Sequence, residues 1–583
     1  MDRTVSLFVF LGAVLTIGFL TVTGNPQRPT GRSLPSWGLV AATWVSVGWF
    51  LVHAEAHALR WPMVSPLSVG DLIAASALIL LVLEATRRTI GLALAVLVLL
   101  FLAYAVFGDR LEGAFGHRPL SITEILDHLV FTTNGLIGPA LAVAAFLVYV
   151  FVLFGAVLDR SGGGDFFFDL SAALVGRQAG GPAKVAVVSS ALYGTISGSP
   201  TADVVTTGAL TIPMMKRLGY RPAYAGAVES SASTGGALLP PVMGSAAFLM
   251  SDFTNIPYAE IVASAALTGV LYYVAVFFAV HARAELDRLG AFDGATARVG
   301  AVLRAGWWHL VPIAALVWLV LSADRPVYGA GLAVVIAAAI LLLRTRAPLH
   351  TAATVLTAAI EAARRAAPVG IACAVAGLVV GSLTITDLAG KFSSLLFSFA
   401  PDLLPVVMLI TAGVTLLLGM GMPTPAVYVL ASVLAAPAMV NLGVPMLAAH
   451  LFVVYFASMS AITPPVAVAA FAAASIAGAD PLRIAVIACR LAVVGFVLPF
   501  CFVWRPALLL IGDPLSIVLA LAATLAGVVA LAAALEGWLA RRLAAPDRAL
   551  LGLAGAALVA PIAWADLAGA LLLAAWLVFL RRR

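Results

Sequence analysis

Long runs of apolar residues recur along the whole chain and are separated by short polar segments. Runs of roughly 18 apolar residues or more are typical of helices that cross the hydrocarbon core of a membrane. We predict such helices, one of them short, over residues 5–23, 37–53, 72–84, 90–107, 137–158, 261–280, 306–321, 327–343, 367–385, 404–420, 484–503 and 507–534. The pattern therefore predicts an all-α, polytopic membrane protein.

The apolar runs at the two ends of the chain need separate interpretation. The first run has only Arg3 before it, is too long for a signal peptide, and is followed by TVTGNPQRP rather than by a cleavage motif, so we expect a retained helix. Near the other end, basic residues at 541–548 and 581–583 flank one long apolar stretch that contains PIAWAD. If both basic clusters face the cytoplasm, this stretch is a helical hairpin that turns at Pro561–Asp566.

Polar segments divide the chain into four predicted parts. These are a four-helix membrane domain at 1–108, a linker at 109–135, a core at 136–505 and a C-terminal transmembrane extension at 506–583.

Two further polar segments, 282–304 and 346–367, subdivide the core. The second of them places Glu361, Arg364 and Arg365 on one face of a helix, which predicts an amphipathic helix at the membrane interface.

Four short motifs in the core recur later in the same order. SPTADV at 199 corresponds to MPTPAV at 422, RLGYRP at 217 to NLGVPM at 441, LLPPVMG at 238 to ITPPVAV at 462, and NIPYAEI at 255 to ADPLRI at 479. The prolines within these motifs keep the same spacing to within one residue. The core therefore contains two copies of one helical unit, at about 160–282 and about 365–500.

Each copy is interrupted twice by residues that break helices. The interruptions are GTISGSPTAD and ESSASTGGALLPP (229–241) in the first copy, and GMGMPTPA (419–426) and ASMSAITPP (457–465) in the second. Non-helical backbone at membrane depth persists only where protein or an aqueous site covers it, and broken helices in matching positions of two repeats indicate a transporter binding site. Their carbonyls and hydroxyls can coordinate Na⁺, and helix N-termini attract anions.

Two acidic residues lie within these segments. Asp203 can balance a bound cation, whereas Glu229 fits a structural and a functional role equally well. Small residues in membrane helices also serve close helix packing, which is the alternative reading of these clusters.

Composition excludes several other classes of protein. The chain is 63% hydrophobic and 10% charged, with a mean hydropathy of +1.09. Its net charge of +6 lies in short loops, as in cytoplasmic loops of membrane proteins, and does not indicate nucleic-acid binding. The three cysteines, Cys373, Cys489 and Cys501, lie in apolar runs without CxxC spacing, so we expect packed thiols.

Enzyme and channel motifs are not found in the sequence. GTISG at 194 has a different order from the GxSxG of hydrolases, and the nearest approach to a phosphate-binding loop is LAGKF at 388. A channel more naturally shows one repeated pore filter. Arg217 and Arg221 belong to a loop, and we find no intramembrane arginine near the breaks that would bind a carboxylate. We therefore expect a transporter that is not an enzyme and is driven by an ion or substrate gradient.

The core closely resembles a known family. FVLFGAVLDRSGGGDFFFDL, SALYGTISGSPTADVVTTGALTIPMMKRLGYRP and GMGMPTPAVYVL are similar to the large subunit of the tripartite ATP-independent periplasmic (TRAP) transporters. More narrowly, the chain resembles the fused branch, in which a four-helix small subunit and the large subunit form one polypeptide. The resemblance covers about 120–505, and the four N-terminal helices match by position and number.

This resemblance implies a fold and a mechanism. It implies two inverted repeats with re-entrant hairpins and broken helices, in an elevator-type transporter of the bacterial inner membrane. Transport would be Na⁺ symport of a small organic anion, received from a periplasmic substrate-binding protein of the TAXI type, with no cofactor besides Na⁺. The ion- and substrate-binding residues that it implies are Ser197, Gly198, Ser199, Thr201, Asp203, Ser231, Ser233, Thr234, Gly235, Gly421, Thr424, Ser458, Ser460 and Thr463, with Glu229 as a coupling acid.

Two residues depart from the family pattern. Asp203 stands where fused members often have Asn, and Pro200 stands where a small residue is common. An acid at 203 could alter ion stoichiometry or admit protons, so Na⁺ and H⁺ coupling both stay open. The alternative function is an ion-coupled organic-anion transporter that works without a binding protein.

Overall fold

The computed structural model describes residues 3–21, 34–292, 297–399, 403–560 and 563–582. These residues are helical almost throughout, and their only strands are the antiparallel two-residue β1 (Trp538–Leu539) and β2 (Arg541–Arg542). Ten of the described helices are long and apolar enough to cross a membrane. The prediction of an all-α, polytopic membrane protein is therefore confirmed.

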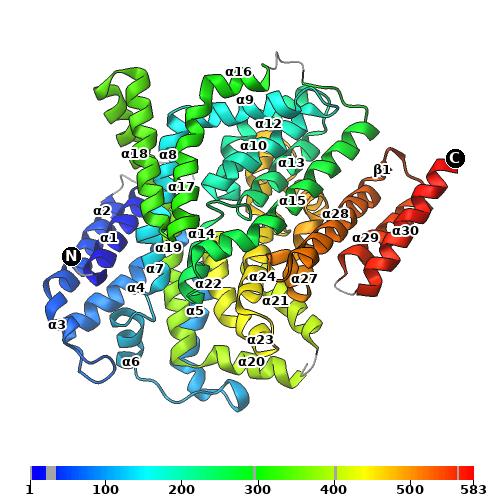
Figure 1. The fold of residues 1–583 in the computed structure, drawn as a ribbon. Helices are drawn as coiled ribbons and strands as arrows, with labels where there is room; N and C mark the ends of the chain where they lie inside the picture. Colours follow the sequence, from blue (N-terminus) through cyan, green and yellow to red (C-terminus); the bar gives the residue numbers. More distant parts are fainter. Residues whose placement is uncertain (1–2, 22–33, 293–296, 400–402, 561–562, 583) are drawn as a thin grey trace.

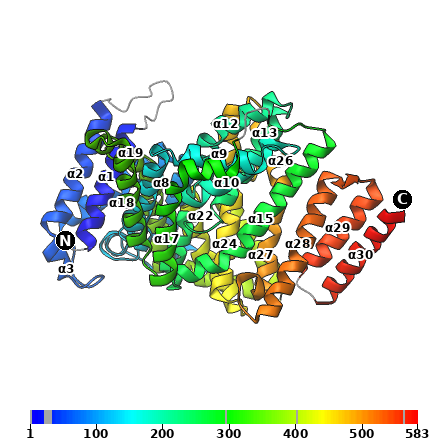
Figure 2. The ribbon, with the colours of Figure 1, turned by 45° about the horizontal axis from the view of Figure 1, so that its top comes forward.

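The N-terminal helices stand at one side of the molecule and the C-terminal helices at the other, with the core between them (Figures 1 and 2). The first part comprises α1 (Arg3–Thr21), α2 (Leu34–Val52), α3 (Ala54–Ala58), α4 (Val69–Thr89) and α5 (Leu92–Phe107). Four of these are candidate spans, as expected. Ser68 and Asp71 begin α4 with a capping box in which each side chain binds the other residue's backbone N–H.

A connector leads from α5 into the core. It comprises η1 (Gly108–Arg110), η2 (Gly113–Phe115), α6 (Ile122–Leu126) and the π-helical η3 (Asp127–Phe131). Arg60 ties the connector to the loop that follows α3, because its Nη2 lies 2.8 Å from the buried Oδ2 of Asp127. The next span is α7 (Pro139–Val143), the π-helical η4 (Ala144–Val148) and α8 (Tyr149–Arg160) in direct succession.

The first repeat and the hairpin that follows it form the upper and central part of the core in Figure 1. The repeat comprises α9 (Gly163–Val175), α10 (Gly181–Ser197), α11 (Pro200–Thr206), α12 (Gly208–Arg217), α13 (Pro222–Gly236), α14 (Ser245–Thr254) and α15 (Tyr258–Leu286). The hairpin comprises α16 (Val299–Gly306), η5 (Trp307–His309), α17 (Leu310–Ala323) and α18 (Pro326–Thr345).

Residues 348–385 form one 38-residue helix, α19 (Pro348–Ile385), and this corrects the prediction of an interfacial helix over 346–367. Pro368 lies inside α19 without ending it. The helix packs against α1, α8 and α22, and contacts on several sides favour an unbroken helix over the local preference of proline. Glu361 and Arg365 are therefore carried into the core rather than along its edge.

The second repeat is interrupted more often than the apolar runs predicted. It comprises α20 (Leu388–Phe399), α21 (Leu404–Leu418), α22 (Thr424–Leu434), α23 (Ala436–Asn441), α24 (Met446–Met459), η6 (Ser460–Ile462), α25 (Val468–Ala477), α26 (Pro481–Leu491) and α27 (Val493–Trp504). The predicted helix 484–503 is divided between α26 and α27, and α25 and α26 meet at a bend of 118°. Asp480 supports this bend because its Oδ2 accepts from the Arg483 N–H at the start of α26.

The C-terminal part comprises η7 (Pro506–Leu509), α28 (Pro514–Glu536), β1, β2, α29 (Ala545–Val559) and α30 (Ala563–Arg582). The last two helices lie side by side (Figure 2), as the predicted hairpin requires, and residues 561–562 of the predicted turn lie outside the described residues. Arg505 holds the end of α29 and the start of α30 together, since its Nη2 lies 2.5 Å from the Ala560 carbonyl oxygen and 2.6 Å from Oδ1 of Asp566.

The breaks of each repeat lie against each other. In the first repeat, a Cβ at Gly198 would lie 2.0 Å from the Met243 carbonyl oxygen, and in the second, a Cβ at Gly419 would lie 2.2 Å from Ser460. The breaks at Pro240–Pro241 and Pro464–Pro465 both contain a cis peptide bond.

The predicted interruption over 229–241 needs correction, because α13 continues to Gly236 and the chain leaves the helix only afterwards.

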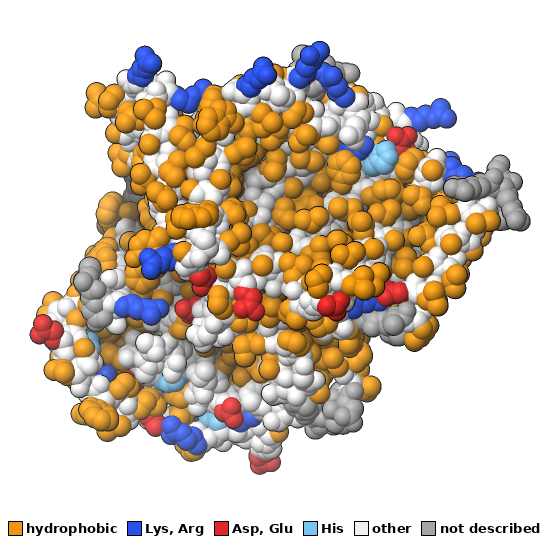
Figure 3. All heavy atoms as spheres, viewed as in Figure 1, with side chains coloured by type: hydrophobic (Ala, Val, Ile, Leu, Met, Phe, Trp, Pro, Cys, Tyr) orange, Lys and Arg blue, Asp and Glu red, His pale blue; other side chains and the backbone are white. Residues whose placement is uncertain are grey.

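Figure 3 shows a wide band of hydrophobic side chains on the visible face, with Lys and Arg along its upper edge. Exposed Val270, Trp318, Leu343, Leu519 and Leu553 belong to the spanning helices and the C-terminal hairpin. Such a surface is unfavourable in water and favourable in lipid. The chain is therefore an integral membrane protein with several spans, as predicted.

Candidate functional site

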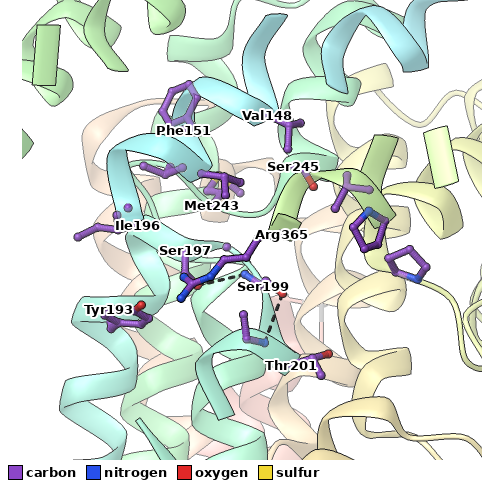
Figure 4. A pocket seen from close by; sticks show the side chains of 18 of the residues that line it. Val148, Phe151, Tyr193, Ile196, Ser197, Ser199, Thr201, Met243, Ser245 and Arg365 are labelled. Atoms are coloured by element: carbon purple, nitrogen blue, oxygen red, sulfur yellow. Dashed lines mark hydrogen bonds between the residues drawn. The ribbon is translucent and has the colours of Figure 1, made fainter. Parts of the chain in front are cut away.

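A cavity of about 490 Å³ lies in the core, where both repeats meet α8 and α19 (Figure 4). Apolar side chains such as Val148, Phe151 and Phe248 form one side of it. Hydroxyl groups of Ser197, Ser199 and other residues line it as well, together with one guanidinium, that of Arg365, and one carboxyl group, that of Asp159. The lining thus combines an apolar surface with a few polar groups, as ligand pockets generally do.

The tip between α10 and α11 supplies the polar wall. Gly198 ends α10 with a φ of 60° and lies so close to the loop after α13 that no side chain fits. Ser199 caps α11, because its Oγ accepts from the Ala202 N–H at 3.5 Å, and Pro200 occupies the first turn. The sequence SGSP therefore reverses the chain sharply and keeps the tip beside the cavity.

Three helices begin at the cavity wall. Ser199 precedes α11, Ser245 begins α14, and Gly421 and Pro423 precede α22, and all of them line the cavity. The N-terminus of a helix carries the positive end of its peptide dipole and N–H groups without helical partners. Both repeats therefore contribute positive potential to one space, and this arrangement favours an anion.

Arg365 brings a full positive charge to the cavity from α19, and this corrects the expectation that no intramembrane arginine lies near the breaks. Figure 4 shows its side chain extending across the cavity towards Ser197 and Tyr193. Its side chain is 33% exposed, and its Nη2 bonds Oε1 of Glu361 one turn earlier. The glutamate also pairs with Arg160, whose Nε lies 3.0 Å from Oε2.

The sequence pattern does not place Arg365 at the cavity, because the polar residues of 346–367 predict a helix at the membrane interface. One signal pointed the other way: Arg365 is separated from the long apolar run at 367–385 by a single residue, so a continuous helix would carry it inwards. The spacing of Glu361 and Arg365, four residues apart, also fits an ion pair that can be held within a helix.

A second cavity of about 320 Å³ adjoins the first. The two share Asp159, Gly164, Phe167 and Tyr193 in their linings. The second is more polar and includes Glu361 and the hydroxyl-bearing Thr207. The ion pairs of Glu361 therefore lie at the junction between the two cavities.

Asp203 lies one layer behind the tip and is completely buried. Ser197, which lines the cavity, donates a hydrogen bond to its Oδ1. Its Oδ2 accepts no hydrogen bond from the residues that the structure describes. That oxygen lies against two glycines, since a Cβ added at Gly194 or Gly236 would approach it to 2.9 or 3.2 Å. Asp203 thus has a carboxylate oxygen without a hydrogen-bond donor among the described residues, and only Ser197 stands between this carboxylate and the cavity.

Glu229 is also completely buried and does not line the cavity. Four hydroxyl groups surround its carboxylate. Ser190 Oγ lies 3.1 Å and Ser233 Oγ 3.3 Å from Oε1, and Thr207 and Thr211 donate further hydrogen bonds. A set of neutral donors of this kind satisfies a buried carboxyl group without a counter-ion.

The other predicted residues divide into two groups. Ser197, Gly198, Ser199, Thr201 and Gly421 line the cavity. The remaining predicted residues do not line it, namely Asp203, Ser231, Ser233, Thr234, Gly235, Thr424, Ser458, Ser460, Thr463 and Glu229.

Several members of the second group have local roles in the packing of helices. Ser231 bonds the carbonyl oxygens of Ala227 and Ala488, at 2.8 and 3.1 Å. A Cβ at Gly235 would lie 2.3 Å from the ring of Tyr272, so this glycine permits close contact between α13 and α15. The packing alternative raised by the sequence therefore describes these two positions.

The fold and this site define a multi-span membrane protein that encloses a binding cavity between two repeats. The model of the DctM component of the tripartite ATP-independent periplasmic transporters matches residues 77–513. This match covers more than half of the chain, and the chain belongs to that family. The resemblance to TRAP transporters is thus confirmed, and so is the expectation of a transporter permease rather than an enzyme.

Individual relatives match parts of the chain. The large permease protein DctM of a C4-dicarboxylate TRAP transporter from Pseudomonas aeruginosa is 26% identical over 194 residues, 33% of this chain and 45% of that protein. The permease protein DctMQ of an isethionate TRAP transporter from Oleidesulfovibrio alaskensis is 23% identical over 331 residues, 56% of this chain and 52% of that protein. The chain thus spans about half the length of these relatives.

Among solved structures, the YdaH transporter of Alcanivorax borkumensis is similar with a TM-score of 0.47 and 16% identity. The similarity covers 70% of this chain and 97% of that one.

Proposed function

We propose that this chain is the membrane permease of a secondary active importer of a small organic anion, coupled to Na⁺ and supplied by a periplasmic binding protein. The observation that carries the proposal is the cavity between the repeats, which is lined both by Arg365 and by residues at the N-termini of three helices. Membership of the DctM family supports it as well.

The chemistry of the cavity suits a carboxylate or sulfonate on a short carbon skeleton. A guanidinium matches the two oxygens of such a group in a bidentate pair. Phe151 and Phe248 offer apolar contact to the carbon skeleton, and the volume of about 490 Å³ suits a small molecule. Relatives are named for C4-dicarboxylate and isethionate, which are small organic acids of this kind.

For the coupling ion, we propose that Na⁺ binds behind the tip at Asp203. The free Oδ2 of that residue supplies an anionic ligand, and serine hydroxyls and backbone carbonyls of the tip supply neutral ones. Coupling to H⁺ through Asp203 or Glu229 is the competing proposal, since both carboxyl groups are completely buried.

Membership of the family supports two further proposals, on the partner and on the motion. We propose a periplasmic binding protein of the TAXI type, and movement of the two repeats as an elevator against a scaffold that includes α1, α2, α4 and α5. The location is the inner membrane of a bacterium.

The test is uptake of radiolabelled organic acids into proteoliposomes that contain the full chain. Uptake is measured with and without the binding protein, and with an inward gradient of Na⁺ or of H⁺. Uptake that needs both Na⁺ and the binding protein supports the proposal. Uptake driven only by H⁺ favours the competing proposal, in which a buried acid couples transport to protons. Uptake without any binding protein establishes the alternative, receptor-independent transporter.

A further inference from the structure

A separate polar cavity of about 460 Å³ lies where the C-terminal ends of α15 and α28 meet α26, β2 and α29. It shares no lining residue with the candidate site. In Figure 1 these elements meet at the right of the molecule, beside the label of β1. Its charged lining residues are Arg283, Asp287, Arg490, Glu536, Arg542 and Arg548.

The cavity has an excess of positive charge. Arg283 pairs with Asp287 at 2.8 Å, and Arg490 pairs with Glu536 at 3.1 Å. Two arginines are left without a carboxylate partner among the described residues of the lining. Their charges make the cavity a site of net charge +2.

These two arginines differ in how they are held. Arg548 is fixed, because its Nε and Nη2 donate to the carbonyl oxygens of Ala534 and Leu535 at 2.8 and 3.0 Å. Arg542 is exposed, and its guanidinium has no hydrogen bond or ion pair to the described part of the chain. One anchored and one free guanidinium are suited to hold an anion that approaches from outside.

Glu536 provides a second, independent observation. Its side chain is only 3% exposed and its Oε1 pairs with Arg490. Its Oε2, however, is buried and accepts no hydrogen bond from the described residues. A buried carboxylate oxygen without a donor is costly, so a ligand that carries a hydroxyl group beside its anion would satisfy it.

The position of the cavity identifies the membrane side. α15 and α28 begin next to Glu260 and Asp513, α18 begins next to Asp324 and Arg325, and all three helices end near arginines, as at 283, 344 and 541–542. Basic residues gather on the cytoplasmic side of membrane proteins. The cavity therefore opens at the cytoplasmic membrane surface, between the core and the C-terminal helices.

We propose that this cavity binds the headgroup of an anionic glycerophospholipid, with its phosphate between Arg542 and Arg548 and its glycerol hydroxyl donating to Oε2 of Glu536. Basic pockets between helices on the cytoplasmic side bind such headgroups. Two phosphates, as in diphosphatidylglycerol, match the excess charge of +2. The helices that line the cavity also carry exposed apolar residues, such as Val270 on α15 and Leu553 on α29.

The bound lipid would join the C-terminal hairpin to the core, since α15 and α26 belong to the core and α28 and α29 to the C-terminal part. This role is independent of the transported substrate and of the coupling ion.

Native mass spectrometry of the purified full chain tests the proposal, with diphosphatidylglycerol, phosphatidylglycerol and phosphatidylcholine as probes. We expect the two anionic lipids to be retained, and Arg542→Gln to weaken their binding at least fivefold. Arg217→Gln is the matched control, because Arg217 is exposed at the end of α12 and lies outside the cavity. The melting temperature of each variant without added lipid verifies that it is folded.

A second experiment distinguishes a lipid headgroup from a free phosphate compound as the ligand. Inorganic phosphate and glycerol 3-phosphate are added at the same concentrations as the lipids. If either raises the melting temperature as strongly as diphosphatidylglycerol, and Arg542→Gln removes the effect, the site takes a free phosphate and the lipid is the wrong source. Equal retention of phosphatidylcholine and diphosphatidylglycerol, or unchanged binding in Arg542→Gln, overturns the proposal.

Discussion

Arg365→Gln is the change that tests the proposed anion site most directly. The substitution keeps a polar side chain of similar length and removes the only positively charged side chain that lines the cavity among the described residues. Hydrogen bonds to a charged group contribute about 1.5–3 kcal/mol. Because the Arg365 side chain is 33% exposed, water screens the interaction, and we use the lower end of that range. About 1.5 kcal/mol corresponds to roughly a tenfold change in affinity.

We therefore expect Arg365→Gln to raise the KM for uptake about tenfold. The fold should persist, because Glu361 keeps its ion pair with Arg160 at 3.0 Å and is itself partly exposed. Arg364→Gln is the matched control, since Arg364 neighbours Arg365 on α19, is exposed, and does not line the cavity. The assay is the initial rate of uptake into proteoliposomes as a function of substrate concentration.

A substitution of Glu361, the ion-pair partner of Arg365, should have the opposite effect on the KM. Glu361 competes with the substrate for Arg365, because it bonds the same guanidinium. Glu361→Gln should therefore lower the KM, whereas Arg365→Gln raises it. An unchanged KM in Arg365→Gln, with normal expression and an unchanged response to Na⁺, would refute the assignment of Arg365 to the substrate.

Three further predictions concern the tip and the buried acids. Gly198→Ala should abolish uptake and lower the melting temperature, because its Cβ would lie 2.0 Å from a carbonyl oxygen, while Gly331→Ala, where nothing lies within 4 Å, should be neutral in both assays. Asp203→Asn should raise the Na⁺ concentration for half-maximal uptake about tenfold, as expected for the loss of one charged ligand, and an unchanged Na⁺ response contradicts a cation site there. Thr211→Val should destabilise the fold by about 1–3 kcal/mol in denaturant titrations, because it removes one donor to a buried carboxylate, and a loss below about 0.5 kcal/mol contradicts that role.

The repeat structure could be predicted from the sequence because proline and glycine have strict backbone preferences. Pro200 and Gly198 fix where a helix starts and ends. Their counterparts in the second repeat are Pro423, which precedes α22, and Gly421, which has a φ of 80° in the turn between α21 and α22. Such local preferences can be read without knowledge of distant contacts. Five residues at these two tips, which the family resemblance implied as binding residues, line the cavity, and their role in binding stays a prediction.

Residues whose position depends on distant contacts could not be placed in this way. Arg365 lies in the cavity because α19 stays unbroken past Pro368, and the neighbours that keep it unbroken come from both halves of the chain. Ser231 and Gly235 were grouped with the break that follows, yet contacts with Ala488 and Tyr272 hold them inside α13. Small residues in a membrane helix have the same composition whether they bind a ligand or another helix.

Ser197 connects the two halves of the proposed site. Its side chain lines the cavity in front of the tip, and its hydroxyl bonds Asp203 behind it. An anion beside Arg365 and a cation at the free oxygen of Asp203 would thus lie on opposite sides of one short segment. Opposite charges placed in this way stabilise each other, so binding of either should favour binding of the other. We therefore propose that symport, if Na⁺ is the coupling ion, rests on mutual stabilisation of the two bound ions at this single tip.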